Sequence, residues 1–136
     1  MPLATGVHLP GFSASVTAAP DGLWTLRLSG LADPQAAPAL AGYLELLDRR
    51  LLETDRALVM ADLRGLLLLS APCFKCLAHW LSTVRDRGLP VAYTVHFLGN
   101  PVHRWQRTRL EALRALAPAV VKLDFGQHGP DGTGPG

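Results

Sequence analysis

Two cysteines separated by two residues form the segment of this sequence with the clearest capacity for chemistry. Cys73 and Cys76 make a Cys-Phe-Lys-Cys motif, just after the run of four leucines Leu66–Leu69 and at the start of a pattern with helical spacing. A Cys-x-x-Cys motif at a helix start lowers the pKa of a thiol and supports thiol–disulfide exchange. One interpretation is therefore a redox protein that alternates between dithiol and disulfide.

Packing offers a simpler interpretation of the same pair. Phe74 falls with Leu77, Leu81 and Val84 on one face of the predicted helix, so this segment already has a core to contribute to. The two cysteines then serve as small apolar side chains beside that stripe. Thioredoxin-like folds also do not usually open with a hairpin, which is what the start of this chain predicts. We favour the packing interpretation and keep the redox one as an alternative.

The other residue types that carry chemistry do not assemble into a recognisable set. Zinc requires four protein ligands, or three and a water molecule. Cys73, Cys76 and His79 follow one another in steps of three, which drift around a helix, and no second Cys-x-x-Cys or His-x-x-x-His completes them. The other histidines are scattered, and no glycine-rich phosphate-binding motif is present. The sequence therefore predicts no metal, no cofactor and no enzyme.

The composition fits one globular domain that does not depend on long-range charge attraction. The chain has 136 residues, of which 49% are hydrophobic and 18% charged, and its formal net charge is +2. This composition supplies a core but little attraction for nucleic acid or an anionic membrane. No apolar run reaches the roughly 18 residues of a membrane span, and the N-terminus lacks the regions of a signal peptide. We expect a cytoplasmic protein.

Hydrophobic periodicity predicts strands and helices in alternation. Period-two alternation predicts strands at 12–18 and 23–29, and the turn Pro20-Asp21-Gly22 joins them into a hairpin. Helical spacing predicts three helices, at 34–53, 71–88 and 101–117. Short apolar runs predict three further strands, at 57–63, 90–98 and 119–125. The expected order of elements is β-β-α-β-α-β-α-β.

This order predicts an α/β domain with a mixed five-stranded sheet. Strands separated by single helices form a largely parallel sheet, to which the hairpin adds an antiparallel edge. We expect the helices mainly on one face, because polar residues alternate along the strand at 23–29 and leave the other face wetter. The domain is expected to span 11–125, between a flexible segment at 1–10 and a disordered Gly/Pro-rich tail at 126–136.

Two long stretches carry a family resemblance. LRLSGLADPQAAPALAGYL combines a strand, a glycine and a helix that opens after an Asp. RALVMADLRGLLLLSAPCFKCLAHWLSTVRDRGLPVAYT combines a central strand ending in Asp-Leu-x-x-Leu, a short loop, a helix, a glycine stop and the next strand. Over residues 12–125 the chain resembles the STAS domain family, the SpoIIAA-like fold of bacterial anti-sigma factor antagonists. The resemblance implies a non-enzymatic regulatory domain that binds another signalling protein, such as an anti-sigma-type kinase.

The switch of that family lies at the N-terminus of the second helix. There the usual motif is Asp-Ser-(Ser/Thr)-Gly, and its first Ser is phosphorylated by the kinase. In the resemblance, Ser70 falls on the Asp, Ala71 on the phosphorylated Ser, Pro72 on the next residue and Cys73 on the Gly. Ala71 has no hydroxyl group, so we expect no phosphorylation at the family position. The domain would then be a constitutive binder or a scaffold.

Ser70 has two interpretations that the sequence leaves open. It is a natural N-cap for the predicted helix, with Pro72 in the first turn. A phosphate on Ser70 would instead place charge beside the partial positive charge of the helix N-terminus and switch a partner on or off. In either case we expect the partner to bind the loop 64–71 and the first turn of the helix. The predicted contact residues are Arg64, Ser70, Ala71, Pro72, Cys73 and Lys75.

Other parts of the sequence suggest further associations. Trp105 and Arg104 lie beside the leucine stripe of the helix at 101–117, and residues of these types are enriched at protein interfaces, so they form a candidate second interface. The arginines of that helix are more simply a solvated face than a nucleic-acid site. If Leu66–Leu69 is an exposed loop, it favours a homo-oligomer. A pocket between helices and sheet would instead make the protein a carrier of a small apolar ligand.

Overall fold

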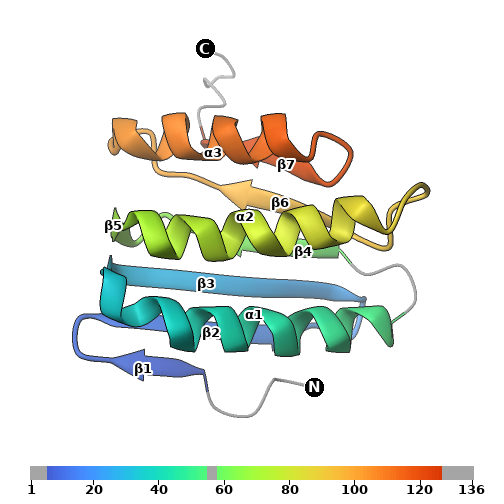
Figure 1. Ribbon diagram of the computed structural model, residues 1–136, viewed down its shortest axis with the longest axis horizontal. Helices are drawn as coiled ribbons and strands as arrows, with labels where there is room; N and C mark the ends of the chain where they lie inside the picture. The colour runs from blue at the N-terminus through green and yellow to red at the C-terminus, as the bar shows by residue number, and fades with distance from the viewer. Residues whose placement is uncertain (1–5, 55–57, 127–136) are drawn as a thin grey trace.

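Three α-helices cover one face of a sheet in this protein (Figure 1). The structure, a computed structural model, describes residues 6–54 and 58–126. The strands within these ranges are β1 (Val7–Leu9), β2 (Phe12–Ala18), β3 (Leu23–Ala32), β4 (Leu58–Asp62), β5 (Leu66–Leu69), β6 (Thr94–Leu98) and β7 (Val121–Asp124). The helices are the short 3-10 helix η1 (Pro34–Ala36), α1 (Ala37–Leu52), α2 (Ala71–Asp86) and α3 (Arg104–Leu116).

The sheet is antiparallel at one edge and parallel over the rest. Its order is β1-β2-β3-β4-β6-β7, and β5 pairs with β3 beyond the end of β4. The three N-terminal strands are antiparallel, whereas β3, β4, β6 and β7 are parallel and are joined through the three helices. The predicted α/β class, the hairpin edge and the position of the helices on one face are confirmed (Figure 1).

Alternating burial along β3 explains why the sheet is covered on one side only. Trp24, Leu26 and Leu28 are buried in the core, whereas Thr25 and Arg27 between them are more accessible. Successive side chains of a strand point to opposite faces, so a period of two gives one apolar face for the helices and one polar face for solvent. The sheet therefore has a single core, on the side of the helices.

Two strands differ from the sequence-based expectation, and the prediction of five strands is wrong. Residues 7–9 belong to the segment predicted to be flexible, but they pair with β2 across a turn at Gly11, whose φ of 81° favours glycine. Leu66–Leu69 is predicted as a loop, but it pairs with the end of β3 and buries Leu66 and Leu69. Strands this short carry too few residues for a period of two to be visible.

Some predictions concern residues outside the described ranges. They include the first residue of the strand predicted at 57–63, residues 1–5 of the predicted flexible segment, and the predicted disordered tail beyond Gly126. The domain limits of 11–125 therefore stay a prediction.

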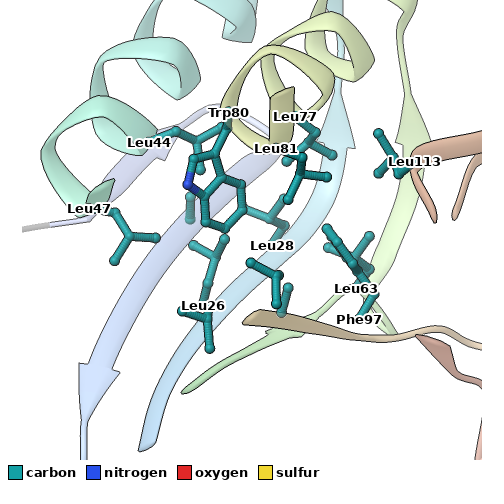
Figure 2. Packing of buried hydrophobic residues seen from close by; sticks show 14 of the residues in the cluster. Leu26, Leu28, Leu44, Leu47, Leu63, Leu77, Trp80, Leu81, Phe97 and Leu113 are labelled. Carbon is teal, nitrogen blue, oxygen red and sulfur yellow. The ribbon is translucent and has the colours of Figure 1, made fainter. Parts of the chain in front are cut away.

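The apolar stripe of α2 differs in detail from the expected one. Cys73 is fully buried, while Phe74 is only partly buried and lies under the guanidinium of Arg109, 4.9 Å from its ring centroid. Trp80, placed by its spacing at the margin of the stripe, is 3% exposed and belongs to the core. Figure 2 shows Trp80 reaching from α2 toward Leu44 of α1, above the strand that carries Leu26 and Leu28. The stripe predicted for α1 is confirmed at all five positions, Leu40, Tyr43, Leu44, Leu47 and Leu51.

A polar network connects α1 and α2 at the edge of this core. Trp80 Nε1 donates to Tyr93 Oη over 2.8 Å, and Tyr93 Oη donates to Asp48 Oδ1 over 2.5 Å. Arg87 donates to both oxygens of Asp48, over 2.9 and 2.5 Å. Burial disfavours the charged carboxylate, but the hydrogen bonds from Arg87 and Tyr93 outweigh it and hold the pKa of Asp48 below its usual value.

The lowered pKa of Asp48 predicts that this network stabilises the fold above acid pH. The unfolded chain binds a proton at Asp48 more readily, so the stabilisation is lost as the pH falls through the folded-state pKa. We expect Asp48→Asn to lower the free energy of unfolding at pH 7 and to flatten its fall below about pH 5, as measured by urea unfolding at a series of pH values. Asp86→Asn, which removes an exposed carboxylate from the same helix pair, is the control and should change little. An unchanged acid limb in Asp48→Asn would contradict this role.

Candidate functional site

The residues predicted to contact a partner gather at the carboxyl end of the parallel strands. β4 ends at Asp62, β5 ends at Leu69, and α2 starts at Ala71. The first turns of α1, α2 and α3 lie at this same end of the molecule (Figure 1), because each helix follows a parallel strand. The structure therefore brings together the loop after β4, β5 and the first turn of α2, as the sequence predicts.

Asp62 fixes the position of Arg64 on this surface. Asp62 is 5% exposed, and its Oδ1 accepts hydrogen bonds from the backbone N (3.1 Å) and Nε (2.9 Å) of Arg64, while Nη2 donates to Oδ2 over 3.0 Å. The Nε of Arg27 lies 3.4 Å from Oδ2. The hydrogen bonds from Arg64 hold the pKa of Asp62 below its usual range although burial opposes them. The side chain of Arg64 stays 59% exposed, so its guanidinium is held in place yet accessible.

Gln106, on α3, is a structural residue of the site that the sequence did not single out. It is fully buried, and its Nε2 donates to the carbonyl oxygens of Leu63 (2.9 Å) and Leu66 (2.8 Å). Its Oε1 accepts from the backbone N of Asn100 over 2.7 Å, and Asn100 Nδ2 donates to the carbonyl of Arg64 over 3.2 Å. One side chain thus joins the loop after β4 to the loop before α3. In the sequence it is one polar residue of a basic helix, which looks solvated.

Ser70 caps α2, as predicted. Its Oγ accepts a hydrogen bond from the backbone N of Cys73 over 3.4 Å, and its own backbone N donates to the carbonyl of Ala32 over 2.9 Å. The helix start is thereby attached to the end of β3. Ala71 and Pro72 are exposed in the first turn, whereas Ser70 is half-buried.

The two thiols are placed for packing rather than for exchange chemistry. Both cysteines are free; Cys73 Sγ donates to the carbonyl of Asp33 over 3.2 Å, and Cys76 Sγ donates to the carbonyl of Ala37 over 3.4 Å. Burial raises the pKa of both thiols. A raised pKa leaves less thiolate at neutral pH, which disfavours nucleophilic chemistry. Cys73, predicted as a contact residue, is fully buried and supports the site from beneath.

Exposed leucines border the same end of the sheet. Leu31 and Leu68 are register partners on β3 and β5 and are 46% and 44% exposed, and Leu67 is 56% exposed. Leu9 lies at the same end, but it pairs with the core residue Phe12, so its side chain is on the face that the helices cover. We call Leu31, Leu67 and Leu68 the leucine patch. Within the run from 66 to 69, whose exposure the sequence left open, only the middle two side chains are exposed.

The remaining predicted contact residues differ in how accessible they are. Lys75 is exposed on the second turn of α2. In the predicted second interface, Arg104 is exposed, whereas Trp105 is partly buried against the core and lies beside the ring of His103, at 6.4 Å between centroids. Trp105 therefore offers only part of its side chain to a partner.

Two kinds of feature, a metal-binding cluster and a membrane-spanning helix, are absent from the described residues. Within 6–54 and 58–126, no group of three or more His, Cys, Asp or Glu side chains is arranged to hold a metal ion. In the same ranges, no helix is long and apolar enough to cross a membrane.

The one-sided sheet, with a second helix that opens beside the end of the central strand, defines a STAS-like fold. The chain is similar to a chain of the crystal structure of the diguanylate cyclase SiaD in complex with its activator SiaC from Pseudomonas aeruginosa. The TM-score is 0.62 at 15% identity, and the match covers 86% of this chain and 97% of that chain, which is the activator SiaC. The predicted family resemblance is thereby confirmed for the fold. No protein-family model and no curated protein matches the sequence.

Loss of the Gln106 side-chain amide should weaken the support of the site. Gln106→Leu removes the side-chain partner of the Leu66 carbonyl and of the Asn100 backbone N–H, while the Leu63 carbonyl keeps the backbone N of Leu66 as a donor, so we expect a loss of roughly 1–3 kcal/mol in the free energy of unfolding. Urea unfolding measures this loss, and amide hydrogen exchange should become faster at residues 63–66 and 100. Gln35→Leu, at an exposed position of η1, is the matched control. Equal stability of the two variants would refute the supporting role.

Proposed function

We propose that the protein is a non-enzymatic regulatory domain that binds another signalling protein through the carboxyl end of its sheet. The observation that carries the proposal is the convergence there of the leucine patch, the fixed guanidinium of Arg64 and the exposed first turn of α2. The similar activator SiaC is found in complex with a diguanylate cyclase, which supports a signalling enzyme as the class of partner. An anti-sigma-type kinase is the partner that the family resemblance suggests.

The composition of this surface suits a protein partner. The leucine patch supplies apolar area whose burial drives association. Arg64 makes the surface selective for the orientation of a partner. Its Nε and Nη2 donate hydrogen bonds to Asp62, and no described residue accepts a hydrogen bond from its Nη1. A carboxylate of the partner fits that position, because charge-assisted hydrogen bonds to a fixed guanidinium are strong and geometrically specific. Ser70, Ala71, Pro72 and Lys75 complete the surface.

The alternative functions have less support. The raised pKa values of Cys73 and Cys76 disfavour a dithiol enzyme, for which the spacing of the two residues remains the argument. Self-association through the leucine patch would use the same surface as the proposed partner, and we propose it as a competing state rather than the function. A cytoplasmic location fits either role and stays a prediction.

Removal of the exposed leucines should weaken partner binding without unfolding the domain. The partner is first identified by affinity purification of the tagged chain from its own cells, and its affinity is then measured with both proteins purified. We expect Leu67→Ser combined with Leu68→Ser to weaken binding at least about tenfold, with the melting temperature nearly unchanged, because both side chains are exposed. Leu89→Ser removes a leucine that is 80% exposed and follows the C-terminal end of α2, away from its first turn, and serves as the control. Equal effects of the two changes would refute this surface.

We propose that binding is constitutive, because Ala71 occupies the position phosphorylated in the family and the Oγ of Ser70 is engaged as a cap. The intact mass of the protein isolated from its own cells, with thiols blocked at lysis, should show no phosphate and two blocked thiols. A phosphate located on Ser70 by fragmentation would overturn constitutive binding and identify a kinase-controlled switch. A Cys73–Cys76 disulfide would restore the redox alternative.

A further inference from the structure

A groove runs between α1 and α2 on the outer surface of the helical layer, apart from the leucine patch. Its volume is about 550 Å³, within the range of roughly 300–1,000 Å³ that is usual for small-molecule sites. Leu44 of α1 and Trp80 and Cys76 of α2 line it, with Pro72 nearer the start of α2 and the exposed Leu52 at the end of α1. The lining is therefore mainly apolar along the length of the two helices.

The indole of Trp80 contributes only apolar surface to this groove. Its Nε1–H already donates to Tyr93 Oη, so no unsatisfied donor of this ring faces a ligand. Figure 2 shows the ring between α2 and the side chains of Leu44 and Leu47. Trp80 and Leu44 are 3% and 2% exposed and form the floor of the groove, so a ligand meets mainly the more accessible apolar lining at Ala41, Leu52 and Cys76, which favours an apolar body.

The charges of the groove favour an anionic group on that ligand. Asp48 also lines it, but its carboxylate is already bonded to Arg87 and Tyr93 and is not available to attract a cation. Lys75 and Arg49 have no ion-pair partner among the described residues, and neither does Glu45, the remaining acid of the lining. The groove thus has two cationic side chains without an ion-pair partner in the described ranges, Lys75 and Arg49, and one such carboxylate, Glu45, so its net charge is positive.

The position of the anionic group follows from the two ends of the groove. Lys75 lies near the start of α2, where the helix dipole adds positive potential. Asp48 and Arg87 lie toward the other end and neutralise each other. An anion is therefore stabilised better beside Lys75.

We propose that the groove between α1 and α2 binds an amphipathic organic anion, with its apolar chain over the floor of Leu44 and Trp80 and against Cys76 and Leu52, and its carboxylate beside Lys75. This site goes beyond the proposed partner surface and does not require that a partner binds. It gives a location to the apolar-ligand alternative that the sequence left open, and it adds a requirement for negative charge.

Titration of the ¹⁵N-labelled protein with dodecanoate tests the proposal, with dodecanol as the uncharged ligand of equal chain length. We expect saturable changes in the amide signals of residues 41–52 and 72–87 and in the indole N–H signal of Trp80. Dodecanoate should bind roughly two- to fivefold more tightly than dodecanol, the preference that one exposed neighbouring cation provides. Equal affinities, changes centred on the leucine patch, or no saturable binding of dodecanoate would each overturn the proposal.

Three variants separate this site from other surfaces. Lys75→Gln should remove the preference for dodecanoate, whereas Lys122→Gln, on β7 and outside the groove, should preserve it. Ala41→Phe, at an exposed position of the groove wall, should block both ligands while the protein stays folded. Unchanged binding in Ala41→Phe would refute the location. If the groove signals respond to the purified protein partner and not to dodecanoate, the groove belongs to the partner surface and the proposal is wrong.

Discussion

The one-sided burial of a parallel sheet is the constraint on which the rest of this structure depends. The fully buried apolar residues of β3, β4 and β6 lie on one face, so every helix that joins two parallel strands must cross back over that same face. Each helix starts at the carboxyl end of one parallel strand and leads the chain back to the amino end of the next. The N-termini of the helices therefore gather at the carboxyl end of the sheet (Figure 1). The proposed partner surface is a consequence of this connectivity.

Buried polar groups then give that end a defined shape. The loop after β4 cannot form ladder hydrogen bonds at every residue, and its free carbonyl groups would be costly to bury unpaired. Gln106 satisfies two of them from α3, and Asp62 binds both the backbone and the side chain of Arg64. These interactions turn an irregular loop into a fixed presentation of one guanidinium beside exposed leucines. A preorganised surface of this kind lowers the cost of ordering side chains when a partner binds.

The helix α2 connects the proposed partner surface with the groove between α1 and α2. Its first two turns, with Pro72 and Lys75, border both the proposed partner surface and the groove beside α1. Its other end is attached to α1 through Asp48 and Arg87. The similarity to the activator SiaC concerns the fold, and at 15% identity the chemistry of these surfaces is specific to the present chain.

The sequence by itself determined the order of the main elements and the helix cap at Ser70, because periodicity and capping are local properties. The fold and the neighbourhood of the site could therefore be predicted. Only the tertiary structure decided that Gln106 is buried, that Leu67 and Leu68 are exposed while the leucines beside them are not, and that a groove opens between two helices. These features depend on which segments distant in sequence lie side by side, and no local pattern encodes that.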